Sequence, residues 1–111
     1  MLIELLVVPE CRNEAAALAV LREAAEAAGL QAVPITVTVI DSDEEAQRRG
    51  FVGSPTFLID DVDPFAIPGA PTGVTCRLYA TAAGPAGVPD VQALREALIT
   101  GRTARSSAAS G

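Results

Sequence analysis

Cys11 and the stretch Gly53-Ser54-Pro55-Thr56 carry the residue types that thiol chemistry needs. Cys11 lies where an apolar run gives way to a helical pattern, and the dipole and free N–H groups of a helix N-terminus stabilise a thiolate. Arg12 favours that charge, whereas the carboxylates of Glu10 and Glu14 oppose it. The alternative is that Cys11 is a small apolar residue that fills a turn. Pro55 opens a strand-like run, a position that accepts either a cis or a trans proline.

Glu14 and Cys76 are the other candidate reactive residues. Glu14 either exchanges a proton near the thiol or is an acidic first-turn residue that complements the helix dipole, and the sequence favours the second role. Cys76 either fills the core or resolves a disulfide formed at Cys11, which requires the two Cα atoms to lie within roughly 7 Å. The apolar surroundings of Cys76 favour the core.

The composition excludes several classes of function. The 111 residues predict one domain, and with 50% hydrophobic but only 4% aromatic residues the core is expected to be aliphatic. The net charge of −6, without a basic cluster, argues against partners such as nucleic acids and anionic membranes. The absence of histidine excludes a Cys-His dyad and the commonest zinc ligand. We therefore expect no metal and no cofactor.

Two further segments argue against a membrane-spanning helix, a signal peptide and a calcium site. The apolar run from Leu2 to Val8 contains Glu4 and is too short to cross a bilayer. It has no basic segment before it, so a signal peptide is not expected and the predicted location is cytoplasmic, with reduced cysteines. The carboxylates in the segment 60–63 lack the glycine and distal glutamate of a calcium loop, which predicts a solvated turn.

The periodicity of apolar residues predicts seven elements in the order β-α-β-α-β-β-α. Ser42-Asp43-Glu44-Glu45 matches a capping box that opens the second, short helix, which is expected to end near Arg49 and Gly50. The remaining elements are strands at 1–8, 35–40, 55–59 and 75–80 and helices at 12–28 and 91–99. The first two strands flank a helix and should be parallel. The domain is predicted to cover residues 1–99, followed by a disordered tail at 100–111.

A cysteine at a strand-to-helix turn, followed by a proline that opens a later strand, resembles the thioredoxin-like superfamily. The resemblance implies an α/β, thioredoxin-like fold with a four-stranded mixed sheet flanked by helices. It also implies that Ser54-Pro55 is cis and faces Cys11, and that the Ser54 backbone offers hydrogen bonds to an extended peptide or thiol ligand. The usual Cys-x-x-Cys motif reads Cys11-Arg12-Asn13-Glu14 here, so Glu14 replaces the resolving cysteine.

A narrower resemblance rests on three stretches, which read Gly53-Ser54-Pro55-Thr56-Phe57-Leu58-Ile59-Asp60, Asp63-Pro64-Phe65 and Cys76-Arg77-Leu78-Tyr79. They look like small bacterial thioredoxin-like proteins, some of which are labelled as relatives of alkylmercury lyase.

Three functions follow as hypotheses. The first is a thiol redox protein in which Cys11 reacts with a small thiol or a protein disulfide and Cys76 or an external thiol resolves the intermediate. The second is a non-catalytic binding module, which the missing second cysteine favours. The third is soft-metal or organomercury binding by the two thiolates.

Overall fold

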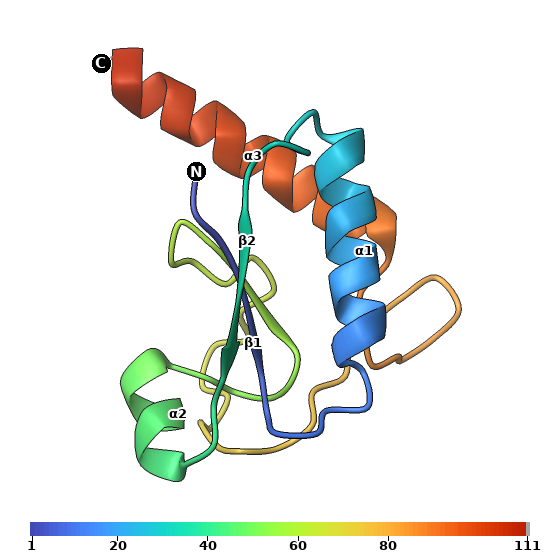
Figure 1. Ribbon diagram of the computed structural model, residues 1–111, viewed down its shortest axis with the longest axis vertical. Helices are drawn as coiled ribbons and strands as arrows, with labels where there is room; N and C mark the ends of the chain where they lie inside the picture. The colour runs from blue at the N-terminus through green and yellow to red at the C-terminus, as the bar shows by residue number, and fades with distance from the viewer. Residues whose placement is uncertain (111) are drawn as a thin grey trace.

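The computed structural model describes residues 1–110, with side chains described through residue 102. Figure 1 shows the arrangement of the chain, and the elements in order are β1 (Ile3–Val7), α1 (Glu14–Ala27), β2 (Ile35–Val39), α2 (Asp43–Arg49), β3 (Thr56–Ile59) and α3 (Val91–Ser110). The predicted strands and helices up to residue 59 are confirmed, with ends that differ by one or two residues.

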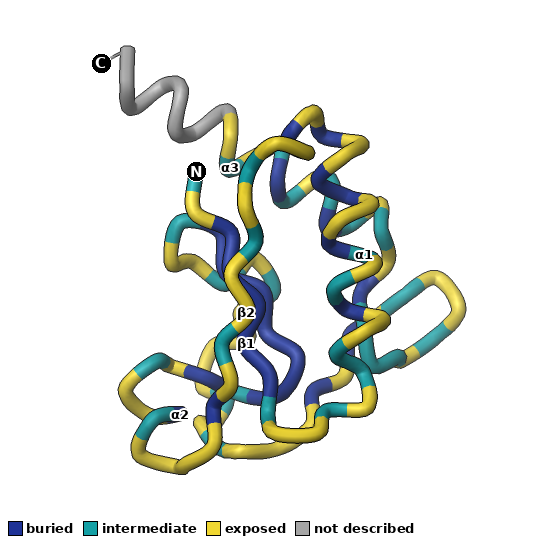
Figure 2. Tube along the Cα trace, viewed as in Figure 1, coloured by how far each residue is buried: buried dark blue, intermediate teal, exposed yellow. Residues whose placement is uncertain are grey.

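The sheet has three strands in the order β2-β1-β3. The central strand β1 runs parallel to β2 and antiparallel to β3, and Leu5 lies between Val37 on one side and Phe57 on the other. The parallel pair is joined by α1, as the alternation of strand, helix and strand predicts. Every residue of β1 is buried, whereas β2 is partly exposed along its length (Figure 2).

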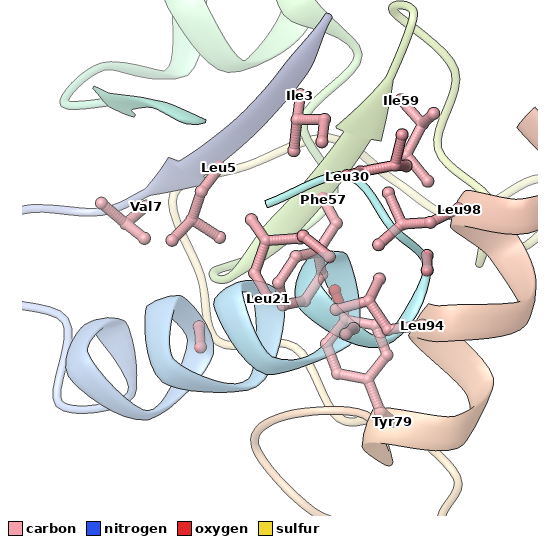
Figure 3. Close-up of a cluster of buried hydrophobic side chains, with 14 residues drawn as sticks. Ile3, Leu5, Val7, Leu21, Leu30, Phe57, Ile59, Tyr79, Leu94 and Leu98 are labelled. Carbon is pink, nitrogen blue, oxygen red and sulfur yellow. The ribbon is translucent and has the colours of Figure 1, made fainter. Parts of the chain in front are cut away.

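One face of the sheet carries the larger part of the core. Side chains alternate between the faces of a strand, so Ile3, Leu5 and Val7 point to the side on which α1 and α3 pack. Figure 3 shows these side chains directed toward α1 and α3, in one buried cluster with Leu21 of α1 and Leu94 of α3. Further buried members of this cluster are Phe57, Ile59, Tyr79 and Leu98. The predicted aliphatic core is therefore supplemented by one phenylalanine and one tyrosine.

The opposite face carries a smaller buried cluster, to which α2 contributes Ala46. Leu6 and Leu58 pack there with Phe51, which follows the helix. Glu4 points to the same face, where its carboxylate forms an ion pair with Arg49 at 2.5 Å and accepts a hydrogen bond from the Thr38 hydroxyl at 2.7 Å. A charged side chain in the middle of the sheet is thus fully paired.

The ends of α2 follow the predicted capping pattern. The Ser42 side chain accepts a hydrogen bond from the Glu45 N–H at 3.1 Å, and Gly50 ends the helix in the left-handed conformation, with φ of 65°. A left-handed C-terminal residue is the usual role of glycine at that position.

The prediction of a fourth strand at 75–80 is wrong, and so is the four-stranded sheet. The backbone hydrogen bonds of this segment are divided between two unrelated partners: Thr75 and Arg77 pair with Ser54, whereas Tyr79 pairs with Ala86 of its own loop. The side chains also reverse the expected burial, because Arg77 is buried and Leu78 is exposed. The sequence pattern of a strand is present, but no continuous ladder forms.

α3 continues beyond the predicted end at residue 99 and reaches Ser110. The Arg102 guanidinium donates a hydrogen bond to the Ala28 carbonyl at 3.1 Å, which ties this part of α3 to the end of α1. The helix therefore extends into the segment predicted as a tail, while the boundary of the domain stays a prediction. Gly111 lies outside the described residues.

Candidate functional site

Cys11 and Ser54, which are far apart in the sequence, are in direct contact. The Ser54 hydroxyl donates a hydrogen bond to the Cys11 sulfur at 3.0 Å. The same hydroxyl oxygen accepts a hydrogen bond from the Val8 N–H at 3.1 Å. Because a hydroxyl has one proton, the Val8 bond leaves that proton directed at the sulfur. The Ser54 side chain is buried, so water does not compete for it.

The Ser54-Pro55 peptide bond is cis. The contact between Ser54 and Cys11 places this bond beside the thiol, so both parts of the prediction for the proline loop are confirmed. The Pro55 carbonyl accepts a hydrogen bond from the Tyr79 hydroxyl, which ties the loop to the segment that carries Tyr79. Pro55 itself is fully buried.

Cys11 precedes α1 rather than lying inside it. The helix begins at Glu14, with Asn13 as its N-cap residue, and the Cys11 carbonyl accepts a hydrogen bond from the Glu14 N–H at 3.2 Å. Cys11 therefore lies two residues before the cap, in the turn after Glu10, whose φ is 55°. The cysteine is half-buried and packs against the core.

Glu14 is the first residue of α1 and the acidic residue of its first turn. Its side chain is half-buried, and in the part of the chain with described side chains it makes no hydrogen bond or ion pair. A carboxylate in a first turn complements the helix dipole. The placement agrees with that role, and a role for Glu14 in proton transfer stays a prediction.

Cys76 is exposed, so the prediction that it fills the core is wrong. It lies instead beside Ser54, with which it forms an isolated parallel bridge. Neither cysteine is in a disulfide. The side chain of Ser54 thus contacts the Cys11 sulfur, while its main chain pairs with the segment that carries Cys76.

The main-chain groups of Ser54 are already used within the chain. The Ser54 N–H donates to the Thr75 carbonyl at 2.8 Å, and the Ser54 carbonyl accepts from the Arg77 N–H at 3.0 Å. Close approach of the two segments depends on Gly53, where an added Cβ would lie 2.8 Å from the Arg77 Cβ. An extended ligand at Ser54 would therefore have to displace residues 75–77.

Arg77 anchors this segment and was missed by sequence reasoning. Its guanidinium forms an ion pair with Asp63 at 2.7 Å and donates to the Phe65 carbonyl at 2.6 Å. The guanidinium also lies 4.7 Å from the centre of the Tyr79 ring. A single arginine within an otherwise apolar run was the available signal. The prediction of a solvated turn at 60–63 misses the inward role of Asp63.

Among the described residues, Tyr79 is the one whose pKa is clearly shifted. Burial raises the pKa of its hydroxyl well above the ordinary value, the nearby Arg77 charge lowers it, and Asp63 raises it by a smaller amount. The phenol ring also packs edge-on against Phe57 and Phe65. Tyr79 is therefore a neutral hydrogen-bond donor to the proline loop over the ordinary pH range.

Other features of the described residues do not add to this site. No group of three or more His, Cys, Asp or Glu side chains that could hold a metal ion occurs there. No described helix has the length and apolar character needed to span a membrane. A hollow of about 840 Å³ opens between α3 and the loop after β3, and its lining, which includes Ile59, Phe65 and Ala97, contains neither cysteine.

Comparison of the chain with protein-family models, with curated proteins and with solved structures finds no match.

Proposed function

We propose that the protein is a thiol redox protein in which Cys11 is the attacking thiol. The observation that supports this proposal is the hydrogen bond from the buried Ser54 hydroxyl to the Cys11 sulfur. Hydrogen bonds to an ionised acceptor are about twice as strong as neutral ones, so this donor stabilises the thiolate more than the thiol. Since the thiolate is the nucleophile in disulfide exchange, the contact favours reaction at Cys11.

The reaction begins with attack of the Cys11 thiolate on a disulfide of a small thiol or of a protein. One substrate sulfur becomes bonded to the Cys11 sulfur, and the other leaves as a thiolate that takes up a proton from solvent. The product is a mixed disulfide. One disulfide bond has replaced another, so this step needs no external oxidant or reductant. The cis-proline loop beside Cys11 supports a thioredoxin-like relationship as part of the same proposal.

Cys76 then resolves the mixed disulfide. Its thiolate attacks the Cys11 sulfur, a Cys11–Cys76 disulfide forms, and the second substrate sulfur leaves as a thiolate. The substrate has then gained two electrons from the cysteine pair, and an external thiol is needed to reduce the protein again. The support for Cys76 in this role is its exposure and its pairing with Ser54.

Reduction of insulin by a chemical dithiol tests this function in the wild type, Cys11→Ser and Cys76→Ser. We expect turnover above the uncatalysed rate in the wild type, loss of that turnover in Cys11→Ser, and a strong decrease in Cys76→Ser that excess small thiol restores. Wild-type turnover that survives Cys11→Ser would refute the assignment of the attacking thiol.

The second candidate function is a non-catalytic binding module. It is favoured by one observation, the carboxylate of Glu14 at the position where the resemblance implies a resolving thiol. In that case the wild type and Cys11→Ser would show the same insulin reduction as buffer alone. Binding of soft metals or organomercury by the two thiolates is a third candidate, for which the proximity of both cysteines to Ser54 is the support.

A further inference from the structure

The outer edge of β2 is unpaired in the described part of the chain. β2 is the end strand of the sheet, and in residues 1–110 no other segment pairs with its free edge. The Ile40 N–H donates to the Val7 carbonyl at 2.7 Å. Alternate residues of a strand point their N–H and C=O groups to opposite sides, so Thr36 and Thr38 also bond to β1 while the main-chain groups of Ile35, Val37 and Val39 point outward.

The side chains of the same strand leave an apolar face uncovered. In the register with β1, the three aliphatic residues of β2 lie on the face that α1 covers over β1. Val37 is nevertheless 39% exposed and Val39 is 51% exposed, which shows that α1 does not extend over them. Only Ile35, at the start of the strand, packs against the core.

The edge also lacks the features that normally prevent pairing with another chain. Natural edge strands carry lysines, prolines or bulges that block association. The sequence of β2, Ile-Thr-Val-Thr-Val, contains no charge and no proline within the strand. The pattern reads the same from either end, with an aliphatic residue at the centre and at both ends and a threonine on each side of the centre.

We propose that two copies of this chain associate through antiparallel pairing of their β2 strands, with the two-fold axis at Val37. This register sets Val37 against Val37 of the other copy and Ile35 against Val39. These are the residues whose main-chain groups point outward, so each such pair exchanges both of its N–H···O hydrogen bonds. Thr36 then faces Thr38, and threonine pairs and β-branched pairs across strands are favourable.

Charges near the strand are compatible with this register. Asp41 lies opposite Val33 of the other copy, so the pairing brings no two carboxylates face to face. The side chains of Arg22 and Glu26 stand near that position, where they line a small hollow with Val33, and their opposite charges compensate each other. The chain as a whole carries −6, so association is expected to strengthen as salt screens the general repulsion.

The association makes one continuous sheet in which the two α1 helices lie on the same face. Between them runs a strip formed by Ile35, Val37 and Val39 of both copies. The partly exposed aliphatic side chains of each copy thereby gain apolar neighbours. Burial of their apolar surface favours association. The proposal is independent of the thiol chemistry, because no cysteine takes part in the pairing.

Sedimentation equilibrium over a range of protein concentrations tests the proposal. The measurement is made with reducing agent present, so that the exposed Cys76 cannot link two chains. We expect the mass to rise from 11.4 kDa toward twice that value. Val37→Lys and Val37→Asp place like charges against each other at the two-fold axis, so each variant alone is expected to stay monomeric. An equimolar mixture of the two is expected to associate.

The matched control is Leu78→Lys, which adds the same charge at an exposed aliphatic residue outside β2 and should leave association unchanged. Hydrogen exchange of the wild type gives a test without mutation: the amides of Ile35, Val37 and Val39 should become protected as concentration rises. A mass of 11.4 kDa at all concentrations, or association that Val37→Lys leaves intact, would overturn the proposal. Failure of the Lys and Asp variants to associate with each other would exclude the axis at Val37.

Discussion

The Ser54 hydroxyl lies 3.0 Å from the Cys11 sulfur and donates a hydrogen bond to it. The two residues belong to different turns, one before α1 and one before β3, and the Val8 N–H fixes the orientation of the hydroxyl between them. The main chain of Ser54 also pairs with the segment that carries Cys76. Ser54 thus connects the Cys11 thiol, the cis-proline loop and the backbone of the segment 75–77.

Ser54→Ala should slow the reaction of Cys11 with a small disulfide at neutral pH. A hydrogen bond to a charged group contributes about 1.5–3 kcal/mol. Because a donor that stabilises a thiolate also lowers its nucleophilicity, with a Brønsted slope of about 0.4–0.5, loss of the lower value should make the rate about three- to fivefold smaller. The measurement is the second-order rate of mixed-disulfide formation at Cys11, read by mass spectrometry of the modified peptide. Ser42→Ala is the control, because its hydroxyl caps α2 and touches neither cysteine. Equal rates in Ser54→Ala and the wild type would show that the contact has no effect on reactivity.

Glu14→Cys should increase insulin reduction. Residues three apart in a helical turn have neighbouring side chains, and the Glu14 N–H already closes such a turn on the Cys11 carbonyl. A thiol at position 14 is therefore placed to attack a mixed disulfide at Cys11. Arg12→Cys is the control, since adjacent residues do not face each other. If both variants gained activity equally, the added thiol would act without regard to the turn, and this explanation would fail.

Arg49→Ala should destabilise the fold by about 3 kcal/mol, since it leaves the charge of a largely buried Glu4 without its partner. The side chain of Glu4 is 11% exposed in the ion pair. Arg48→Ala is the matched control on the same helix, because Arg48 is 70% exposed and pairs with Glu45. Exposed pairs contribute about 0–1 kcal/mol. Urea unfolding measures both, and equal losses in the two variants would contradict the argument from burial.

Tyr79 should make stability fall at high pH. Burial raises the folded-state pKa of its hydroxyl above the ordinary value of 10.0. The unfolded state then releases the phenol proton first as pH rises, so the contribution is fully present below about pH 10 and is lost progressively above it. Tyr79→Phe should show a smaller decrease over the same interval. It should also be less stable by about 1 kcal/mol at neutral pH, because the bond to the Pro55 carbonyl is lost. The measurement is the free energy of unfolding of the wild type and Tyr79→Phe as a function of pH. An equal decrease in both proteins above pH 10 would show that Tyr79 is not the cause.

The parts of the fold that the sequence predicts are those determined by local patterns. The apolar run at Ile3–Val7 and the capping box at Ser42 act through periodicity and neighbouring residues, and both are confirmed. The segment 75–80 has the residue types of a strand, but its hydrogen-bond partners are Ser54 and Ala86. Those partners are set by tertiary contacts, above all the ion pair of Arg77, which no local pattern reveals.

The candidate site also has features that were predictable from the sequence and features that were not. The cis proline and its contact with Cys11 follow from the resemblance and are confirmed by the geometry. The exposure of Cys76 was not predictable from its apolar neighbours, because the inward direction of the segment is taken by the side chain of Arg77. The free edge of β2 was equally hidden, since it depends on which strand ends the sheet.

The roles of Cys11 as the attacking thiol and Cys76 as the resolving thiol are tested by treating the reduced protein with glutathione disulfide and mapping the products by mass spectrometry after an acid quench. We expect a glutathione adduct on Cys11 that accumulates in Cys76→Ser, and a Cys11–Cys76 disulfide with no lasting adduct in the wild type. Cys11→Ser should react more slowly, at the exposed Cys76 alone. A wild type that carries glutathione on Cys76 while Cys11 stays unmodified would show that Cys11 is not the attacking thiol.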